Sequence, residues 1–249
     1  MHGVSLHQQG LLDAARMVYE QVLAKHARHF DALHLLGVLA YQQGDAQRSA
    51  TSIAQALAID PSHPGAHSNL GLALLHLRRF DEALASFDRA VALRPEFADG
   101  HLNHGDALLA LGRFEEAVDS YGRALALNPA LTKAHAKRGF ALQSLARYQE
   151  ALDDYDVACL ANPHDAESLS NRGVVLKALG RLEEALATCR QAIALDPKQA
   201  GAFNTLGTVL MALHRMPEAE AALDQALALE PAHSEAHWNK GLALLLQGQ

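Results

Sequence analysis

Six prolines recur every 34 residues without an insertion, at Pro61, Pro95, Pro129, Pro163, Pro197 and Pro231. One compact domain has no reason to repeat at a fixed interval. A stack of helical hairpins does, because each hairpin must meet its neighbour with the same geometry. We number the repeat so that these prolines fall at position 32. The period predicts one elongated all-α array over the 249 residues rather than one or two globular domains.

Four other positions of the repeat also hold one kind of residue. Glycine stands at position 8 in Gly37, Gly71, Gly105, Gly139, Gly173, Gly207 and Gly241. Alanine dominates position 20 in Ala83, Ala117, Ala151, Ala185 and Ala219, and position 27 in Ala56, Ala90, Ala124, Ala158, Ala192 and Ala226. Position 24 is mostly bulky, in Tyr19, Ile53, Phe87, Tyr121, Tyr155, Cys189 and Leu223. We interpret the small residues as points where helices approach closely, and the bulky residues as filling the space that remains.

Residues 98–131 illustrate one unit. A helical period of apolar residues predicts a first helix, A, from about Asp99 to Leu111. Gly112 can adopt the left-handed conformation that ends it. A second helix, B, is predicted from Phe114 to Leu127, and Pro129 prevents its continuation. No hairpin of this kind can bury its apolar face alone, so we expect stability to come from stacking.

These columns resemble the tetratricopeptide repeat over the whole chain. The resemblance implies a right-handed superhelical solenoid of antiparallel helix pairs. We expect a single array over 1–249, with a partial repeat at 1–29, full repeats at 30–63, 64–97, 98–131, 132–165, 166–199 and 200–233, and helix A alone at 234–249, ending near a turn at Gly248. It also implies a function in binding protein or peptide.

Composition argues against several other classes of protein. The formal net charge of −7 and the lack of an obvious basic face argue against nucleic acid as a partner, and we expect no membrane partner either. The first ten residues lack the basic and apolar runs of a signal peptide, and no apolar run approaches the length of a membrane span, so we expect a cytoplasmic protein. No nucleophile is paired with a base and no loop is built for phosphate. We therefore expect no enzyme activity and no cofactor.

Several conspicuous residues have a structural interpretation. Arginine at position 16 is followed three residues later by glutamate in the first turn of helix B, as in Arg113 and Glu116, where the helix dipole favours the acid. Four of the 15 histidines, His67, His101, His135 and His237, share position 4, on the packing face rather than in an open metal site. Cys159 and Cys189 stand at apolar positions and are expected to be small core residues.

The binding surface implied by the family is the concave side lined by helix A. Position 6 there is asparagine in Asn69, Asn103, Asn171 and Asn239. Asparagine is a poor helix former, and its amide offers a donor and an acceptor that match a peptide group. We predict that this ladder holds an extended peptide backbone. The alternative is that the asparagines bond one another or water. Charged neighbours complete the candidate surface: Asp99, Asp106, Glu167 and Glu235 are acidic, and Lys133, Lys137 and Lys177 are basic.

Two finer resemblances concern the partner. Asn103, Lys133 and Lys137 resemble half of a clamp for a C-terminal carboxylate, but Ser68 and Leu72 stand where its other half should be. The segments GAHSNLG (65–71), DGHLNHG (99–105) and EAHWNKG (235–241) are similar to repeats of O-linked N-acetylglucosamine transferases and of bacterial repeat–glycosyltransferase fusions. This resemblance implies a substrate-recognition region whose catalytic domain is absent from these residues. One departure is charge at position 7, where leucine is usual: we expect the heads of His104, Arg138, Arg172 and Lys240 to reach water.

A further alternative is a structural scaffold that self-associates through its ends. The last helix presents a run of apolar side chains that no helix B covers: Trp238, Leu242, Leu244, Leu245 and Leu246. An exposed apolar patch of this size usually has a partner. We therefore expect either end-to-end self-association or a further downstream segment that covers this patch.

Overall fold

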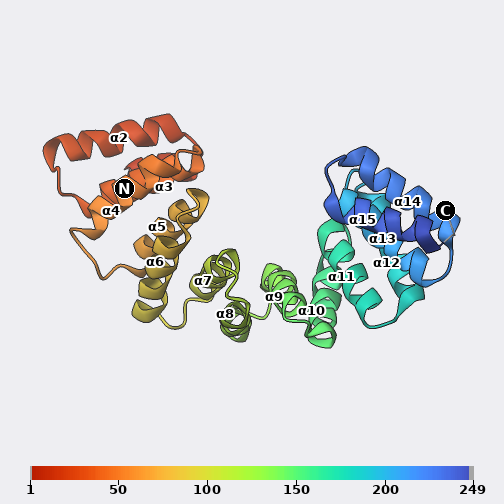
Figure 1. The fold of residues 1–249 in the computed structure, drawn as a ribbon. Coiled ribbons are helices and arrows are strands. Elements are labelled where there is room, and N and C mark those ends of the chain that lie inside the picture. Colours follow the sequence, from red (N-terminus) through yellow and green to blue (C-terminus); the bar gives the residue numbers. More distant parts are fainter. Residues whose placement is uncertain (1, 247–249) are drawn as a thin grey trace. The chain divides into compact units, whose positions relative to one another are not determined.

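The computed structural model describes residues 2–246, and these form fifteen α-helices and no strand (Figure 1). The helices are α1 (His2–Gln8), α2 (Leu12–Lys25), α3 (Phe30–Gln42), α4 (Ala46–Leu57), α5 (Pro64–His76), α6 (Phe80–Leu93), α7 (Ala98–Ala110), α8 (Phe114–Leu127), α9 (Thr132–Ser144), α10 (Tyr148–Ala161), α11 (Ala166–Ala178), α12 (Leu182–Leu195), α13 (Ala200–Ala212), α14 (Met216–Leu229) and α15 (Ser234–Leu246). The all-α prediction is confirmed. The predicted turn at Gly248 lies outside the described residues.

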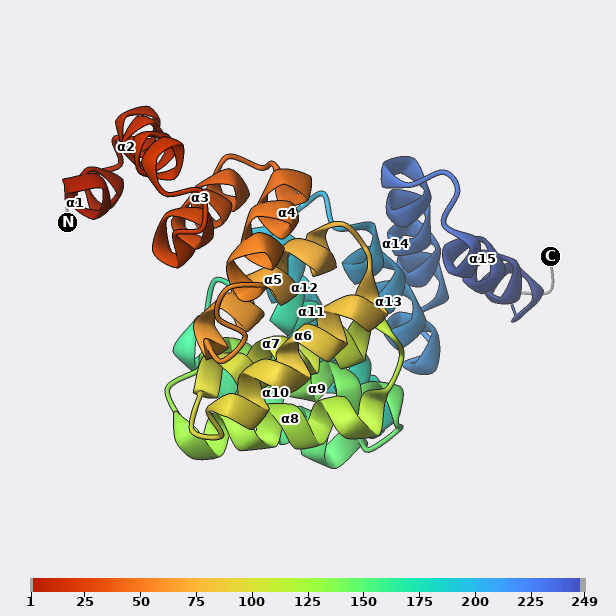
Figure 2. The same cartoon turned by 90° about the vertical axis from the view of Figure 1, so that its left-hand side faces the viewer.

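The chain divides into two compact units, residues 1–129 and 130–249, and the division falls near the end of the repeat 98–131. In each unit the helices pack pair on pair in chain order (Figures 1 and 2). Each helix A packs against its own helix B, and each helix B packs against the next helix A of its unit. Successive A helices also contact each other: α3 with α5, α5 with α7, α9 with α11, α11 with α13, and α13 with α15. B helices show no comparable contact, so the A helices form the inner side of each stack.

The turn between helix A and helix B is the same in each described repeat. In the repeat 98–131, the amide of Arg113 donates to the carbonyl of Leu108 at 2.9 Å, which closes the last turn of α7. One residue of each such turn has a positive φ. It is glycine at Gly10, Gly44, Gly112 and Gly180, with φ from 72° to 83°. Three other residues hold the same position with φ of 57° to 58°: Arg78, Ala146 and His214. The left-handed turn expected at Gly112 is confirmed.

The small and bulky columns meet inside each hairpin. All seven side chains at position 24 are buried, and the position 8 glycines face them. A Cβ added to Gly71 would lie 2.6 Å from the ring of Phe87, and one added to Gly105 would lie 2.6 Å from the ring of Tyr121. The alanines of position 20 are fully buried as well. The sequence interpretation of these columns is confirmed for the six glycines from Gly37 to Gly207, because a side chain larger than hydrogen there would displace the bulky residue.

The arginine and glutamate columns form surface pairs. Arg113 Nε and a terminal guanidinium nitrogen donate to the two carboxylate oxygens of Glu116 at 2.7 and 2.6 Å. The other four repeats have the same two bonds: Arg79 with Glu82, Arg147 with Glu150, Arg181 with Glu184, and Arg215 with Glu218. Both side chains of each pair are largely exposed. They therefore belong to the solvated edge, as expected.

The charged side chains at position 7 form ion pairs with aspartates instead of ending in water. His104, Arg172 and Lys240 each bind an aspartate of the preceding helix B: Asp88 at 2.9 Å, Asp156 at 2.6 Å and Asp224 at 2.5 Å. The sequence expectation was wrong on this point because it considered each helix A alone. The acids stand sixteen residues earlier, at position 25, on the helix against which the next repeat packs. These pairs join one hairpin to the next.

Arg138 finds a different partner, because its counterpart at position 25 is Gly122. It binds both carboxylate oxygens of Asp154 in its own hairpin, at 2.7 and 2.8 Å. His135 also contacts Asp154, with Nδ1 2.7 Å from Oδ1. Only 3% of the Asp154 side chain is exposed. The hydrogen bond to this buried carboxylate raises the pKa of the Arg138 guanidinium.

The other position 4 histidines tie helix A to the loop before it. The Nε2 atoms of His67, His101 and His237 lie 2.8 to 2.9 Å from the carbonyl oxygens of Pro61, Pro95 and Pro231. Their role in packing is consistent with the sequence interpretation. Across residues 2–246, no group of three or more histidine, cysteine, aspartate or glutamate side chains is placed to hold a metal ion.

None of the described helices combines the length and the apolar character that crossing a membrane would require.

Candidate functional site

The candidate surface is the inner face of the A helices, considered separately in each unit. In the N-terminal unit it carries Asn69 on α5 and Asn103 on α7, both half-buried. The amide nitrogen of Asn69 lies 2.9 Å from Nε2 of His34, and that of Asn103 lies 3.4 Å from the hydroxyl oxygen of Ser68. His34 and Ser68 both stand at position 5 of the preceding repeat. Each of these contacts therefore joins position 6 of one A helix to position 5 of the A helix before it.

The C-terminal unit repeats this geometry. Asn239 on α15 donates from Nδ2 to Oδ1 of Asn204 on α13 at 2.9 Å, and Asn204 is at position 5. Asn171 on α11 is half-buried, and its side chain forms no hydrogen bond within residues 2–246. Among residues 2–246, no two of the four position 6 asparagines bond each other; Asn239 bonds Asn204, which was not among the candidates. A comparison of position 5 with position 6 of the next repeat could have found it.

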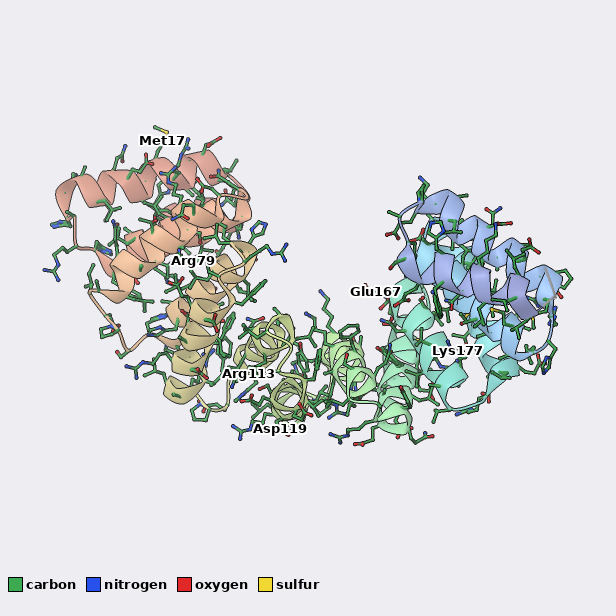
Figure 3. The ribbon with its side chains drawn as sticks, in the orientation of Figure 1. Met17, Arg79, Arg113, Asp119, Glu167 and Lys177 are labelled. Carbon is green, nitrogen blue, oxygen red and sulfur yellow. The ribbon has the colours of Figure 1, made fainter. Side chains whose placement is uncertain are left out.

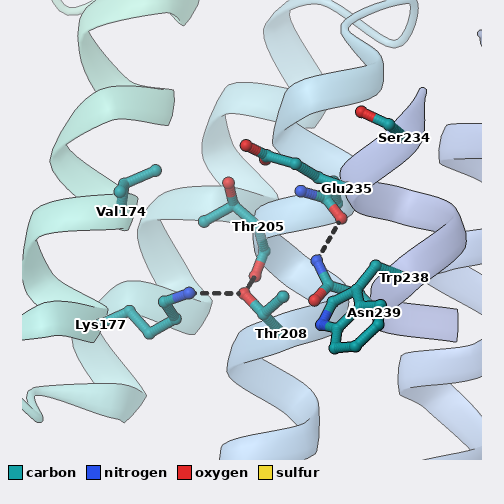
Figure 4. A pocket seen from close by; sticks show the side chains of 9 residues that line it. Val174, Lys177, Thr205, Thr208, Ser234, Glu235, Trp238 and Asn239 are labelled. Carbon is teal, nitrogen blue, oxygen red and sulfur yellow. Dashed lines mark hydrogen bonds between the residues drawn. The ribbon is translucent and has the colours of Figure 1, made fainter. Parts of the chain in front are cut away.

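Two connected depressions lie on the inner face of the C-terminal unit. The first has a volume of about 480 Å³ and is lined by residues of the A helices and the loops before them: Glu167, Ser170, Asn171, Val174, Asp196, Gln199, Gly201, Asn204, Thr205, His233 and Glu235. The second, also about 480 Å³, shares Val174, Asn204, Thr205 and Glu235 with it and adds Lys177, Thr208, Ser234, Trp238 and Asn239 (Figure 4). Together they form a groove across α11, α13 and α15, which we call the C-terminal groove.

Trp238 is the feature of this groove that the sequence interpretation did not select. Its side chain is 76% exposed, although tryptophan is usually largely buried. Figure 4 shows its ring beside Asn239, at the edge of the depression. It occupies position 5, the position at which His34, Ser68 and Asn204 contact the next A helix. A comparison of position 5 across the repeats could therefore have identified Trp238 from the sequence.

The charged candidates differ in how they are held. Lys177 donates to the hydroxyl oxygen of Thr208 at 3.1 Å (Figure 4). Asp106 accepts the hydroxyl proton of Tyr121 at 2.8 Å, and burial together with this acid raises the pKa of Tyr121. Glu167 (labelled in Figure 3) and Glu235 are both exposed. Within residues 2–246, their carboxylates form no hydrogen bond or ion pair. Asp99, on α7, is also exposed.

The residues of the clamp resemblance lie in different units. Asn103 is on α7 of the N-terminal unit, whereas Lys133 and Lys137 are on α9 of the C-terminal unit. Lys133 is exposed and Lys137 is half-buried. The structure describes each unit by itself, so the clamp stays a prediction from the sequence.

The inner face of the N-terminal unit holds a ring cluster that the sequence interpretation did not identify. Phe30, His34 and His63 lie with ring centroids 5.0 to 5.6 Å apart. His63 Nδ1 accepts the amide proton of Ala66 at 3.0 Å and caps α5. Burial and the neighbouring His63 lower the pKa of His34, while Asp31 opposes this shift. The surroundings of His34 therefore favour its neutral imidazole.

The two cysteines carry no sign of a reactive site. Both are free thiols. Cys189 is fully buried against Gly173, and burial raises its pKa to about 12. Cys159 is partly buried, and burial raises its pKa to about 11. A thiol needs a lowered pKa to act as a nucleophile at neutral pH. The interpretation of Cys189 as a core residue is confirmed.

Comparisons with known proteins agree with this fold. Models of the tetratricopeptide repeat match residues 1–64, 34–98, 68–132, 166–199 and 204–249. A search of curated proteins gave no match. Among solved structures, YrrB, described as a TPR protein with an unusual peptide-binding site, is 24% identical with a TM-score of 0.66, covering 77% of this chain and 99% of its own.

Two other solved structures cover more of the sequence. A chain of the APC/C hetero-tetramer Cut9–Hcn1 is 18% identical with a TM-score of 0.75, and the match covers 98% of this chain and 48% of that one. PilF of Pseudomonas aeruginosa is 19% identical with a TM-score of 0.72, covering 85% of this chain and 96% of its own. At these identities the structures show a shared fold. The family models match well over half of the sequence, and the chain belongs to the tetratricopeptide repeat family.

Proposed function

We propose that this protein binds an extended peptide segment of another protein on the inner face of its A helices. The observation that carries the proposal is the way the position 6 asparagines are held. Asn69, Asn103 and Asn239 each use the amide nitrogen toward the preceding repeat. Within residues 2–246, their side-chain oxygens accept no hydrogen bond. A fixed amide with a free acceptor suits the N–H groups of a peptide backbone.

Two further observations support this function. The C-terminal groove has the mixture of apolar and polar lining that ligand sites use, with Trp238 and Val174 beside Asn171 and Thr205. YrrB, which shares the fold, is described as having a peptide-binding site. Contacts with a peptide backbone carry little information about sequence, so affinity and selectivity would come from different residues of the groove.

The test is substitution of Asn171, because its side chain has no bond to lose inside the protein. Alanine is the better helix former by several tenths of a kcal/mol, so Asn171→Ala should keep or slightly raise stability. A lost hydrogen bond should weaken a bound peptide by about 0.5–1.5 kcal/mol, which is about twofold to tenfold in Kd. The matched control is Gln225→Ala, which removes an exposed amide from helix B α14.

The probe is a synthetic peptide selected by the full chain from a random dodecapeptide phage library, measured by titration. The triple variant Asn69→Ala, Asn103→Ala and Asn171→Ala should lose tenfold or more in affinity. N-methylation of the peptide's amides should weaken binding more than scrambling its side chains. Unchanged affinity in both asparagine variants, with lower melting temperatures, would assign the asparagines to stability alone.

Two other functions stay as hypotheses. Self-association is favoured by the exposed apolar face of α15, where Trp238, Leu245 and Leu246 are 76%, 74% and 59% exposed. A role as the substrate-recognition region of a glycosyltransferase depends on the sequence resemblance of 65–71, 99–105 and 235–241. The glycosyltransferase hypothesis is tested by asking whether the source gene encodes a catalytic domain after Gln249.

A further inference from the structure

We infer that the C-terminal groove selects a peptide that carries a lysine or arginine close to an aromatic or long aliphatic residue. This inference deepens the proposed function and rests on it. The basic side chain would lie at the acidic end of the groove, and the apolar side chain would lie on Trp238.

The acidic end is formed by the first turns of α11 and α15. Glu167 and Glu235, both at position 2, line the first depression together with Asp196. His233 is the one basic side chain in this lining. The carboxylates of Glu167 and Glu235 have no ion pair within residues 2–246, whereas Glu184 and Glu218 in the same unit bind arginines. Uncompensated negative charge in a depression attracts a cation.

Lys177 forms no ion pair with Glu167 or Glu235 within residues 2–246. It lies ten residues after Glu167 on α11, which is roughly 15 Å along the helix at 1.5 Å per residue. That separation exceeds the screening length of about 8 Å at physiological salt. Its ammonium group is also bound to Thr208. The groove is therefore acidic at the start of its helices and carries its one lysine near their other end.

Trp238 supplies the second contact. Trp238 is 76% exposed, so the apolar surface of its indole is removed from water only when a partner covers it. Aromatic side chains of this kind are common anchors at protein interfaces. Val174 and the two threonines, Thr205 and Thr208, line the same depression. Acids in the first turn also stabilise their own helices through the dipole, but this role does not explain an exposed tryptophan in the same groove.

The experiment begins with random dodecapeptides displayed on phage and selected on the full chain. Enriched sequences should place lysine or arginine within about three residues of an aromatic, leucine or isoleucine residue. One such peptide is then labelled with fluorescein, and its anisotropy is measured during titration with protein. Trp238 is the single tryptophan of the chain, so its own fluorescence should shift to shorter wavelength on binding.

Three variants separate the contributions. The double variant Glu167→Gln and Glu235→Gln should weaken this peptide about tenfold and reduce the effect of salt on its affinity. Trp238→Ala should weaken it about tenfold as well. The matched control is Glu183→Gln with Glu220→Gln, which removes the same charge from B helices α12 and α14 and should leave affinity unchanged.

The outcomes are distinct. Selected peptides without a basic residue, or equal affinity for both double variants, would overturn the inference while leaving peptide binding intact. Selection of no peptide above the level of an unrelated protein would overturn the proposed function itself.

Discussion

At the scale of single residues, the fold depends on glycines that leave room for a bulky side chain of the neighbouring helix. Gly71 lies against the ring of Phe87, and any Cβ there meets ring carbon at 2.6 Å. Gly241 occupies the same position 8 on α15, but nothing lies within 4 Å of its Cβ direction. One column of the repeat therefore contains both a required glycine and a tolerant one, which sequence periodicity could not distinguish.

We expect Gly71→Ala to destabilise the protein by about 1–3 kcal/mol, because the ring of Phe87 must move. Gly241→Ala should instead stabilise it by up to about 1 kcal/mol, through helix propensity alone. Urea denaturation followed by circular dichroism measures both. Equal effects of the two substitutions would contradict the assignment of Phe87 as the residue that requires glycine.

His34 should make stability depend on pH. Its Nε2 faces the amide nitrogen of Asn69 at 2.9 Å, a geometry for the neutral ring, and its pKa is lowered by burial and by His63. The unfolded chain then binds a proton near the ordinary pKa of about 6.5, while the folded chain does not. Stability is complete above that pH and falls as the pH drops through 6.5 toward the lowered value. Burial also lowers the pKa of His104, against the effect of Asp88, so its contribution has the same sign.

Thermal melts at pH 7.5, 6.5 and 5.5 test this dependence. As the pH falls across this interval, the melting temperature of His34→Ala should fall less than that of the natural chain. The difference between the two melting temperatures should therefore shrink. His26→Ala, which removes an exposed imidazole, should follow the natural chain throughout. Parallel curves for His34→Ala and the natural chain would show that His34 does not titrate in this range.

At the scale of the helix, the ion pairs differ in burial and therefore in their contribution to stability. The five arginine–glutamate pairs at the start of the B helices are exposed, and pairs of that kind contribute at most about 1 kcal/mol each. The pair of Arg138 and Asp154 is different, because its acid is buried between α9 and α10. It replaces the leucine and serine that stand at the same positions in the second repeat, Leu70 and Ser86.

Asp154→Ser alone should cost about 1–3 kcal/mol, since it leaves the partly buried Arg138 and His135 without their acid. Adding Arg138→Leu should recover most of this loss, because the double variant reproduces the pairing of Leu70 with Ser86. Chemical denaturation of the two single variants and the double variant gives the coupling energy. Additive losses would show that the two side chains are independent.

At the scale of the whole molecule, the periodic part of the sequence predicted the periodic part of the structure. The all-α fold, the helices around Gly112 and the buried column at position 24 all follow from a period of 34 and the sizes of the residues. The prediction of one array over 1–249 is not tested by the structure, which describes two units.

What the period could not predict lies between neighbouring repeats. The partners of His104, Arg172 and Lys240 stand on another helix, sixteen residues away, and become visible only when hairpins are packed. The same is true of the contact from Asn69 to His34, which joins two A helices. Asn69, Asn103, Asn171 and Asn239 all stand on A helices, and their role in binding a peptide stays a prediction.

We also expect reversible self-association through α15, because exposed apolar patches tend to be covered. Sedimentation velocity between about 10 and 500 µM should show an average mass that rises with concentration. Leu245→Asp with Leu246→Asp should abolish the rise. Leu160→Asp, at a leucine of α10 that is 84% exposed and lies outside α15, should not. A monomer at every concentration would contradict the expectation.

The left-handed turns have a practical consequence for anyone who engineers this scaffold. Arg78, Ala146 and His214 adopt a φ near 58°, where a side chain costs about 1–2 kcal/mol and glycine costs little. Replacing any one of these three residues with glycine should therefore raise the free energy of unfolding by about 1 kcal/mol. The turns join helix A to helix B and contribute no residue to the C-terminal groove. The thermal limit of the protein and the specificity of its groove can thus be adjusted independently.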